Sequence, residues 1–384
     1  MIRPARIEAR AFRIPIAEPV ATSFGVMRDR PAVILRIEDG EGCFGFGEAF
    51  ANWPAAGAEH RVRLFEHDIA PLAFRDWAGP ADLRLALEAE TRIRALQCGE
   101  PGPFRQIIAA LDIAMHDLAA RRAGRSLRRL LRPDAPDRVG AYASGIDVRR
   151  AGETIARARD GGFRHFKVKV GFDDDADPDR LRNLAGELAP DETLAADANQ
   201  AWDLTRATRF VDATRELMLE WLEEPLPADA DPADWAALAA TATHPLAAGE
   251  NIAGEGGFAA AIGSGALHVL QPDAIKWGGV SGSLSVAREA LAARLRLCPH
   301  FLGSGIGLAA SGEILAAAGG DGRLEVDVNP NPLRSDIGAG GIGPEGEWRC
   351  VDGPGLGITA LPTHWSGFET ARCVNVAPSR GAAR

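Results

Sequence analysis

The strongest constraint on the fold of this chain is a regular spacing of ionisable residues along its second half. The series consists of Lys169, Asp197, Glu223, Glu250, Asp273, His300 and Glu325. Each residue ends or follows a short apolar run, and the successive separations are 28, 26, 27, 23, 27 and 25 residues. A step of this size is the length of one strand plus one helix. The spacing therefore predicts that each residue lies at the carboxyl end of its own strand.

The apolar pattern divides the chain into three parts. The first 50 residues alternate as antiparallel strands do, EDGEG at 38–42 predicts a hairpin, and residues 81–131 show helical periodicity, so we predict an α+β unit over 1–130. Over 131–349, eight short apolar runs alternate with helical stretches, which predicts a parallel sheet closed into a barrel. Residues 350–384 show no further repeat, and we expect them to pack on the first unit.

Composition excludes several classes of partner. The net charge is -10, and no Lys/Arg-rich run is interleaved with aromatic residues, so we expect no nucleic acid partner. Five scattered cysteines without a CxxC motif predict reduced thiols in a cytoplasmic protein. The start MIRPARIEARAF lacks the apolar core of a signal peptide, and no run approaches about 18 apolar residues, so we expect no membrane partner.

Three carboxylates fall on consecutive predicted strands: Asp197, Glu223 and Glu250. Carboxylates that converge at one rim repel one another unless they are protonated or bound to a metal. Oxygen ligands suit Mg²⁺, whereas zinc usually takes His or Cys, which this set lacks. The pattern predicts a magnesium site. The alternative is that each acid caps a helix or lies on the surface.

Two lysines, Lys167 and Lys169, stand one residue apart in the strand-like run HFKVKVG. Residues i and i+2 of a strand point to the same side, so both ammonium groups should enter the barrel mouth. Adjacent like charges lower a lysine pKa, which would make Lys169 a base near neutral pH. Lys167 would lower that pKa and neutralise a substrate carboxylate. The alternative is two lysines that reach solvent from an edge strand.

A second proton carrier is expected at His300, which follows the run LRLC. Asp273 lies one repeat earlier, and its carboxylate can hold the imidazole in one tautomer. A base on each side of a metal predicts removal of a proton α to a carboxylate, with the metal stabilising the enediolate charge.

Other classes fit the sequence less well. A metal-dependent barrel hydrolase would need an HxH pair at a strand end, and the sequence has none there. The glycines of LGSGIGLAASG could bind phosphate, but they more readily let the chain turn above the seventh strand. A non-catalytic metal-binding protein would need neither the paired lysines nor the Asp–His arrangement, and it stays a remote alternative.

Taken in order, these motifs resemble those of the enolase superfamily, and within its mandelate racemase/muconate lactonizing enzyme family those of the mandelate racemase subgroup. The motifs are KVKVG, DANQAW, WLEEPL, GEN, QPDAIKWGGVSG, CPHF and LEVD. The resemblance covers nearly the whole chain. It implies a (β/α)7β TIM-like barrel with an α+β capping domain completed by the C-terminal segment. The muconate-cycloisomerase-like subgroup has Lys where this chain has Asp273, and usually Asp where it has Glu250, so both positions favour the mandelate racemase subgroup. Lys276 is three residues beyond Asp273, and we expect its side chain to point away from the site.

The resemblance also implies roles for these residues. One Mg²⁺ per active site would be bound by Asp197, Glu223 and Glu250, with the first Glu of EEP as ligand rather than Glu224. Lys169 and His300 would act from opposite faces of the substrate, and Asp273 would partner His300. Glu325 would donate a hydrogen bond to the substrate carboxylate, Asn199 would contact an α-hydroxyl, and Ser144 the carboxylate. A symmetric homo-oligomer, from dimer to octamer, is implied as well.

The outcome after proton removal depends on the small-molecule carboxylate substrate. If the substrate has a β-hydroxyl, His300 can act as an acid and expel that group as water. We expect this outcome, the dehydration of a hydroxy acid or acid sugar. Otherwise His300 can return a proton, which gives a racemase or epimerase. Two capping loops, 21–31 and 50–61, should set specificity. An apolar wall would be formed by Phe24, Met27 and Trp53. A distal carboxylate of the substrate would be bound by Arg28 or Arg30. The alternative for either arginine is a solvent-exposed turn residue.

Overall fold

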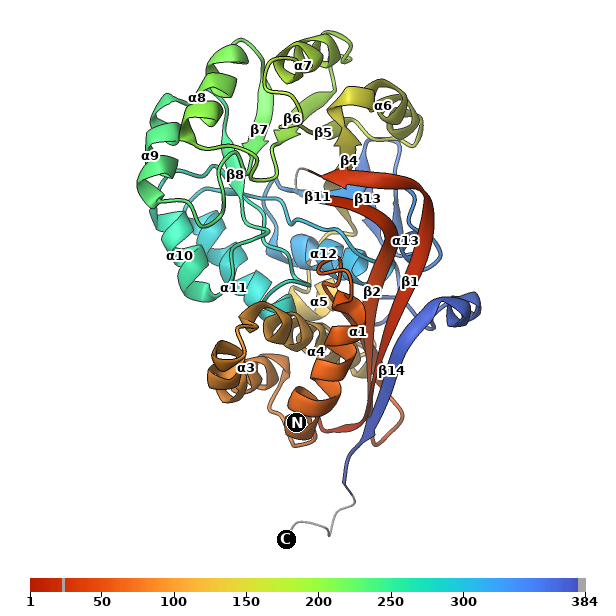
Figure 1. Ribbon diagram of the computed structural model, residues 1–384. Helices are drawn as coiled ribbons and strands as arrows, with labels where there is room; N and C mark the ends of the chain where they lie inside the picture. Colours follow the sequence, from red (N-terminus) through yellow and green to blue (C-terminus); the bar gives the residue numbers. More distant parts are fainter. Residues whose placement is uncertain (23–24, 379–384) are drawn as a thin grey trace.

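The capping domain is built on an antiparallel sheet that joins both ends of the chain (Figure 1). The computed structural model describes residues 1–22 and 25–378. In the sheet order β14-β1-β2-β3, the strands are β1 (Pro4–Thr22), β2 (Gly25–Asp39), β3 (Phe44–Ala49) and β14 (Glu369–Val376). The turn between β2 and β3 falls on the predicted hairpin. Strand β14 pairs with β1, so the C-terminal segment returns to the first unit.

Helices α1 (Gly57–Leu64) and α4 (Pro101–Arg122) cover one face of this sheet. The remaining helical segments of the cap are the π-helical turn η1 (Phe65–Ile69), α2 (Ala70–Ala73), α3 (Pro80–Gln97), which packs on α4, and α5 (Leu127–Leu131), which packs on α4 and on the barrel. Helix α4 lies directly on β3, because Gly45 and Gly47 have no side chain there. A Cβ at Gly47 would lie 2.0 Å from the carbonyl oxygen of Ala110. This close approach places one face of α4 above the barrel.

The barrel contains eight parallel strands. These are β4 (Arg138–Asp147), β5 (His165–Lys169), β6 (Thr193–Asp197), β7 (Leu219–Glu223), β8 (Leu246–Ala248), β9 (Val269–Leu270), β10 (Arg296–Leu297) and β11 (Arg323–Asp327). Each strand from β4 to β9 pairs with the next, and β11 pairs with β4. The fold is a (β/α)7β TIM-like barrel with an α+β cap, as the sequence predicted.

Seven helices follow the first seven barrel strands and form the outer layer (Figure 1). They are α6 (Ala151–Asp160), preceded by the 3₁₀ turn η2 (Val148–Arg150), α7 (Asp177–Gly186), α8 (Leu204–Ala213), α9 (Pro232–Thr241), α10 (Glu255–Gly263), α11 (Gly279–Ala292) and α12 (Gly305–Ala318). After β11 come α13 (Pro332–Ser335), β12 (Gly340–Ile342), β13 (Glu347–Cys350) and the 3₁₀ turn η3 (Thr363–Phe368).

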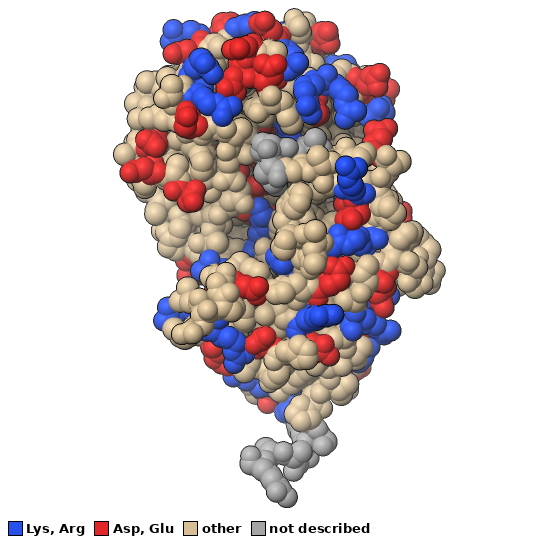
Figure 2. Space-filling model, in the orientation of Figure 1, with Lys and Arg blue, Asp and Glu red and all other residues tan. Residues whose placement is uncertain are grey.

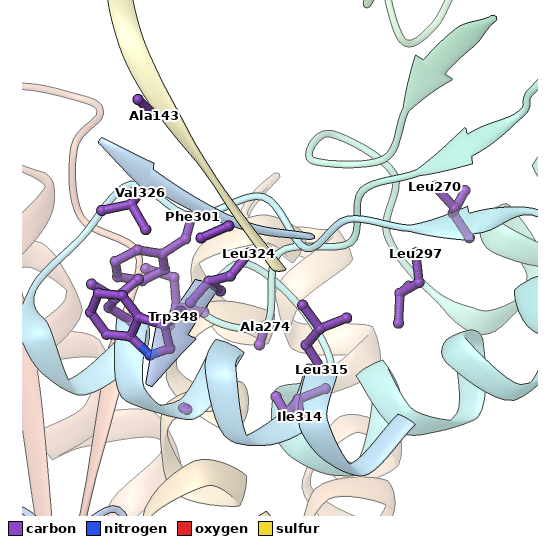
Figure 3. Packing of buried hydrophobic residues seen from close by; sticks show 14 of the residues in the cluster. Ala143, Leu270, Ala274, Leu297, Phe301, Ile314, Leu315, Leu324, Val326 and Trp348 are labelled. Atoms are coloured by element: carbon purple, nitrogen blue, oxygen red, sulfur yellow. The ribbon is translucent and has the colours of Figure 1, made fainter. Parts of the chain in front are cut away.

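Two apolar layers hold the barrel together. Inside it, Tyr142, Trp221 and Cys298 belong to one buried cluster contributed by facing strands. Outside it, side chains of β11 pack against α12, and Figure 3 shows Leu324 and Val326 of this strand on the side of Trp348. Because these two apolar layers hold the strands in place, the polar strand ends stay fixed at the rim.

One element of the cap differs from expectation. Residues 50–61 were expected as a loop, but α1 begins at Gly57. The apolar residues Ala58, Val62 and Phe65 recur at helical spacing and are buried, so the helix is held by packing on the sheet. Within the described residues, we find no helix long and apolar enough to cross a membrane.

Candidate active site

A cavity of about 400 Å³ lies between the barrel mouth and the cap. In the space-filling view, a hollow with basic side chains inside it is visible between the two parts of the molecule (Figure 2). The barrel contributes Lys169, Asn199, Gln200, Glu250, Asn251, Lys276, His300 and Leu302 to its lining. Most of these residues end a barrel strand or follow it within a few residues, as the spacing predicted.

The strand register explains why the charged residues meet. Lys169, Asp197 and Glu223 are the last residues of β5, β6 and β7, and they are neighbours in the parallel ladders. The chain turns sharply just beyond them: Asn199 and Glu224 have φ values of 45° and 39°. Such left-handed residues are uncommon outside glycine and concentrate at functional sites.

Lys167 lies at the centre of the charge network and is 1% exposed. Its Nζ lies 2.7 Å from Glu223 Oε2 and 2.9 Å from Glu325 Oε1. Burial disfavours the ammonium, but these carboxylates raise the pKa of Lys167 well above its ordinary value. Lys167 is therefore a fixed positive charge below the cavity floor.

Lys169 reaches the cavity itself. Its Nζ donates to Asp197 Oδ2 at 3.0 Å and to Asn199 Oδ1 at 2.5 Å. Burial and the neighbouring Lys167 lower the pKa of Lys169, but Asp197 and Glu250 outweigh them and raise it. The predicted depression of this pKa is therefore wrong for this arrangement, because the sequence did not show how closely Asp197 would pair with Lys169.

His300 enters the cavity from the segment after β10. Its Nδ1 lies 2.8 Å from Asp273 Oδ2, and its Nε2 contacts Glu250. Burial opposes a positive charge, but Glu250, Glu325 and Asp273 raise the pKa of His300 well above its usual value. The structure therefore brings Asp273 and His300 together in the geometry that orients an imidazole ring.

Glu325 and Ser144 lie within the neighbouring strands β11 and β4, and Glu325 is two residues before the end of its strand, not at the end as the spacing predicted. Ser144 Oγ donates to Glu325 Oε1. Burial raises the pKa of Glu325, but Lys167 and His300 hold it below its ordinary value. In this pairing Glu325 accepts hydrogen bonds, whereas the resemblance implied that it donates one to substrate.

The three carboxylates expected to bind Mg²⁺ each pair with a cation in this structure. The pairs are Asp197–Lys169, Glu223–Lys167 and Glu250–His300. Within residues 1–22 and 25–378, no three Asp, Glu, His or Cys side chains are already arranged around one point as metal ligands. Metal binding at this rim would therefore require these side chains to turn from their present partners.

The donor chemistry of the rim fits a hard divalent cation. Six carboxylates gather here with only four basic side chains: Asp197, Glu223, Glu224, Glu250, Asp273 and Glu325 with Lys167, Lys169, Lys276 and His300. Burial, only partly offset by Lys167, raises the pKa of Glu223 to about 7, and burial with Glu250 raises that of Glu224 well above normal. A divalent cation would offset this excess of negative charge.

The specificity residues predicted from the capping loops are only partly brought together. Met27 and Trp53 line the cavity. Arg28 is exposed, and the cavity lining among described residues does not include it. Arg30 is buried at 2% exposure and pairs with Asp327 at 2.9 Å, so it supports the fold instead of facing substrate. Phe24 lies outside the described residues.

Sequence reasoning missed several residues of the cavity. Lys276 was expected to point elsewhere, but a tight turn, with Lys276 N donating to Asp273 O at 3.1 Å, returns it to the mouth. Its Nζ lies 3.6 Å from Glu250 Oε1. Asn52 and Gln106 of the cap also line the cavity. Amide side chains leave no spacing signal in a sequence, so these two could not have been identified.

Two family models match the chain. The N-terminal domain of mandelate racemase / muconate lactonizing enzyme matches residues 6–131, and the enolase C-terminal domain-like model matches residues 150–363. A D-galactarolactone cycloisomerase of Agrobacterium fabrum is 30% identical over 277 residues, which are 68% of this chain and 73% of that protein. Further curated relatives are named as dehydratases, racemases and epimerases.

Solved structures share the fold over nearly the whole chain. A mandelate racemase/muconate lactonizing enzyme from Bordetella bronchiseptica is 47% identical with a TM-score of 0.89, covering 95% of this chain and 99% of that chain. An enolase from Bradyrhizobium complexed with magnesium and mandelic acid is 30% identical with a TM-score of 0.83, covering 97% and 100%. This chain is therefore an enzyme of the mandelate racemase/muconate lactonizing enzyme family within the enolase superfamily.

Proposed function

We propose that this enzyme removes the α-proton of a carboxylate substrate, with Lys169 and His300 as the two proton carriers. The observation that supports this most is that both side chains reach the same cavity from different barrel strands. Lys169 ends β5, and His300 follows β10 across the barrel mouth. A substrate bound between them can lose its α-proton to one of these residues, while the other residue faces the opposite side of the α-carbon.

Asp197, Glu223 and Glu250 are the residues that we propose to hold Mg²⁺. When bound, Mg²⁺ supplies positive charge for the carboxylate oxygens as the α-proton leaves. The chain itself adds Lys167, a buried ammonium at the same rim. Lys169 can accept a proton only as a neutral amine, and the ion pair with Asp197 keeps it an ammonium. If Asp197 bound Mg²⁺ as proposed, its carboxylate would no longer pair with Lys169.

Asp273 would keep the His300 ring aimed into the cavity. An Asp–His pair delivers a proton from a defined position, as expulsion of a β-hydroxyl requires. We therefore propose dehydration of a hydroxy acid or acid sugar as the first candidate reaction. The second candidate is racemisation or epimerisation, in which His300 returns a proton to the other face. Relatives with either kind of name occur, which supports the shared proton-removal step.

The test is a screen of hydroxy acids, acid sugars and acylated amino acids in deuterated buffer with Mg²⁺. Product mass and stereochemistry would distinguish loss of water from inversion. We expect at least one acid to exchange its α-hydrogen, and Lys169→Met or His300→Asn to reduce that turnover. Failure of every acid in a broad library to exchange would contradict the proposed function.

A further inference from the structure

The cap presents an amide to the cavity whose orientation is fixed by an arginine. Gln106 lies on α4 and lines the cavity, and Arg61 lies on α1 and is 3% exposed. Arg61 Nε and Nη2 lie 3.0 and 2.8 Å from Gln106 Oε1. An arginine side chain only donates hydrogen bonds, so the oxygen of Gln106 must face it. The amide nitrogen of Gln106 must then point the other way.

Arg61 is itself held in place. Its Nη2 lies 3.3 Å from the carbonyl oxygen of Trp53, and its Nη1 lies 3.4 Å from that of Gly57. The same side chain therefore positions both the cavity loop that contains Trp53 and the amide of Gln106. A donor held by buried contacts discriminates between ligands well, because little freedom is lost on binding.

Among the described residues, the amide nitrogen of Gln106 has no hydrogen-bond acceptor. Within the described parts of the chain, no residue accepts a hydrogen bond from Gln106 Nε2, while Oε1 receives both bonds from Arg61. An unpaired donor at a half-buried cavity wall favours a ligand oxygen that accepts a hydrogen bond.

The described residues of the cap that line the cavity carry no charged side chain. They are Met27, Phe50, Asn52, Trp53 and Gln106. All charged lining residues lie on the barrel side, where the substrate carboxylate is proposed to react. The far end of a substrate therefore meets amides and apolar walls.

We infer that Gln106 is a specificity-determining residue, and that the enzyme takes monocarboxylic acids whose far end bears a neutral oxygen, such as a hydroxyl, ether or carbonyl. This inference rests on the proposed function for the position of the reacting carboxylate. Gln106 Nε2 donates to the distal oxygen, and the uncharged wall rejects a distal ammonium. Arg61 acts as a positioning residue for this donor.

The test compares acids that differ only at the far end: methoxy or ketone, hydroxyl, methyl and ammonium. In Gln106→Glu the donor becomes an acceptor of similar size that still pairs with Arg61. We expect kcat/KM for the methoxy and ketone acids to fall by about 10-fold or more, that for the methyl acid to change little, and that for the ammonium acid to rise. Gln97→Glu, an exposed glutamine on α3, is the matched control.

A second variant, Arg61→Lys, tests the positioning role, and thermal unfolding checks that each variant folds. We expect Arg61→Lys to reduce the preference for methoxy and ketone acids over the methyl acid while α-hydrogen exchange of the methyl acid persists. Equal effects of Gln106→Glu on all four acids would overturn the inference while leaving the proposed function in place. Absence of exchange with every acid in the wild-type enzyme would refute the proposed function and, with it, this inference.

Discussion

Replacing Glu48 by glutamine should change how the stability of this enzyme depends on pH. Glu48 belongs to β3 of the cap and is 1% exposed. Its carboxylate accepts hydrogen bonds from Ser304 N at 2.7 Å, Ser304 Oγ at 2.6 Å and Gly307 N at 2.8 Å. It therefore ties the cap to the first turn of α12, four residues beyond His300.

The magnitude follows from the pKa of this carboxyl. Burial, opposed by the three hydrogen bonds, raises the pKa of Glu48 from 4.5 to about 7. A raised native pKa means that the folded state binds the proton more tightly, so this contribution to stability is complete below pH 4.5 and is lost as the pH rises to 7. The loss is about 3 kcal/mol at about 1.4 kcal/mol per pKa unit.

Glutamine does not titrate, but its amide nitrogen must face at least one of the donors around it. We expect Glu48→Gln to be less stable than wild type at pH 5 by about 1–3 kcal/mol. This difference should shrink or reverse by pH 8. An unfolding entropy of about 2.1 cal/mol/K per residue gives about 0.8 kcal/mol/K for 384 residues, so the relative Tm should shift by about 4 °C.

The assay is thermal unfolding of both proteins by circular dichroism from pH 5 to pH 8. Glu187→Gln, which alters an exposed carboxylate, is the matched control and should show a constant difference from wild type. A pH-independent difference for Glu48→Gln, or one that grows with pH, would show that Glu48 does not have the raised pKa inferred from its burial.

Three further predictions concern the site and its support. Lys169→Met and His300→Asn should each lower turnover by about 10²- to 10⁴-fold while circular dichroism shows an intact fold, and full activity in both would refute their role as bases. Glu223→Gln should weaken Mg²⁺ binding measured by calorimetry; unchanged affinity would move the ligand assignment to Glu224. Arg30→Met should lower the free energy of unfolding by about 3 kcal/mol, because a buried carboxylate loses a partner, and an unchanged Tm would contradict that.

The barrel side of the site could be predicted from sequence because parallel strands impose a fixed step. Once Lys169 and Asp197 are one strand–helix unit apart, the register places them side by side, and the structure shows them as ladder neighbours. The pairing of charges could not be predicted. Whether Asp197 faces a lysine or a metal decides the direction of the Lys169 pKa, and spacing alone does not contain that information.

The cap side of the site was beyond sequence reasoning for a different reason. Gln106 reaches the cavity only because α4 lies directly on β3 and Arg61 holds its amide. These are contacts between elements far apart in sequence, with no repeat to reveal them. For Arg30 the sequence predicted a role in substrate binding that the structure does not support. This arginine of the predicted specificity loop is buried against Asp327 and supports the fold.

The central claim, that carboxylates from neighbouring strand ends hold one divalent ion between two proton carriers, is tested most directly by crystallography with Mn²⁺ in place of Mg²⁺. The account predicts a single anomalous peak in each active site, coordinated by Asp197, Glu223 and Glu250, with Lys169 and His300 on either side of the adjoining cavity. A peak bound elsewhere, or no peak at this rim at saturating Mn²⁺, would contradict it.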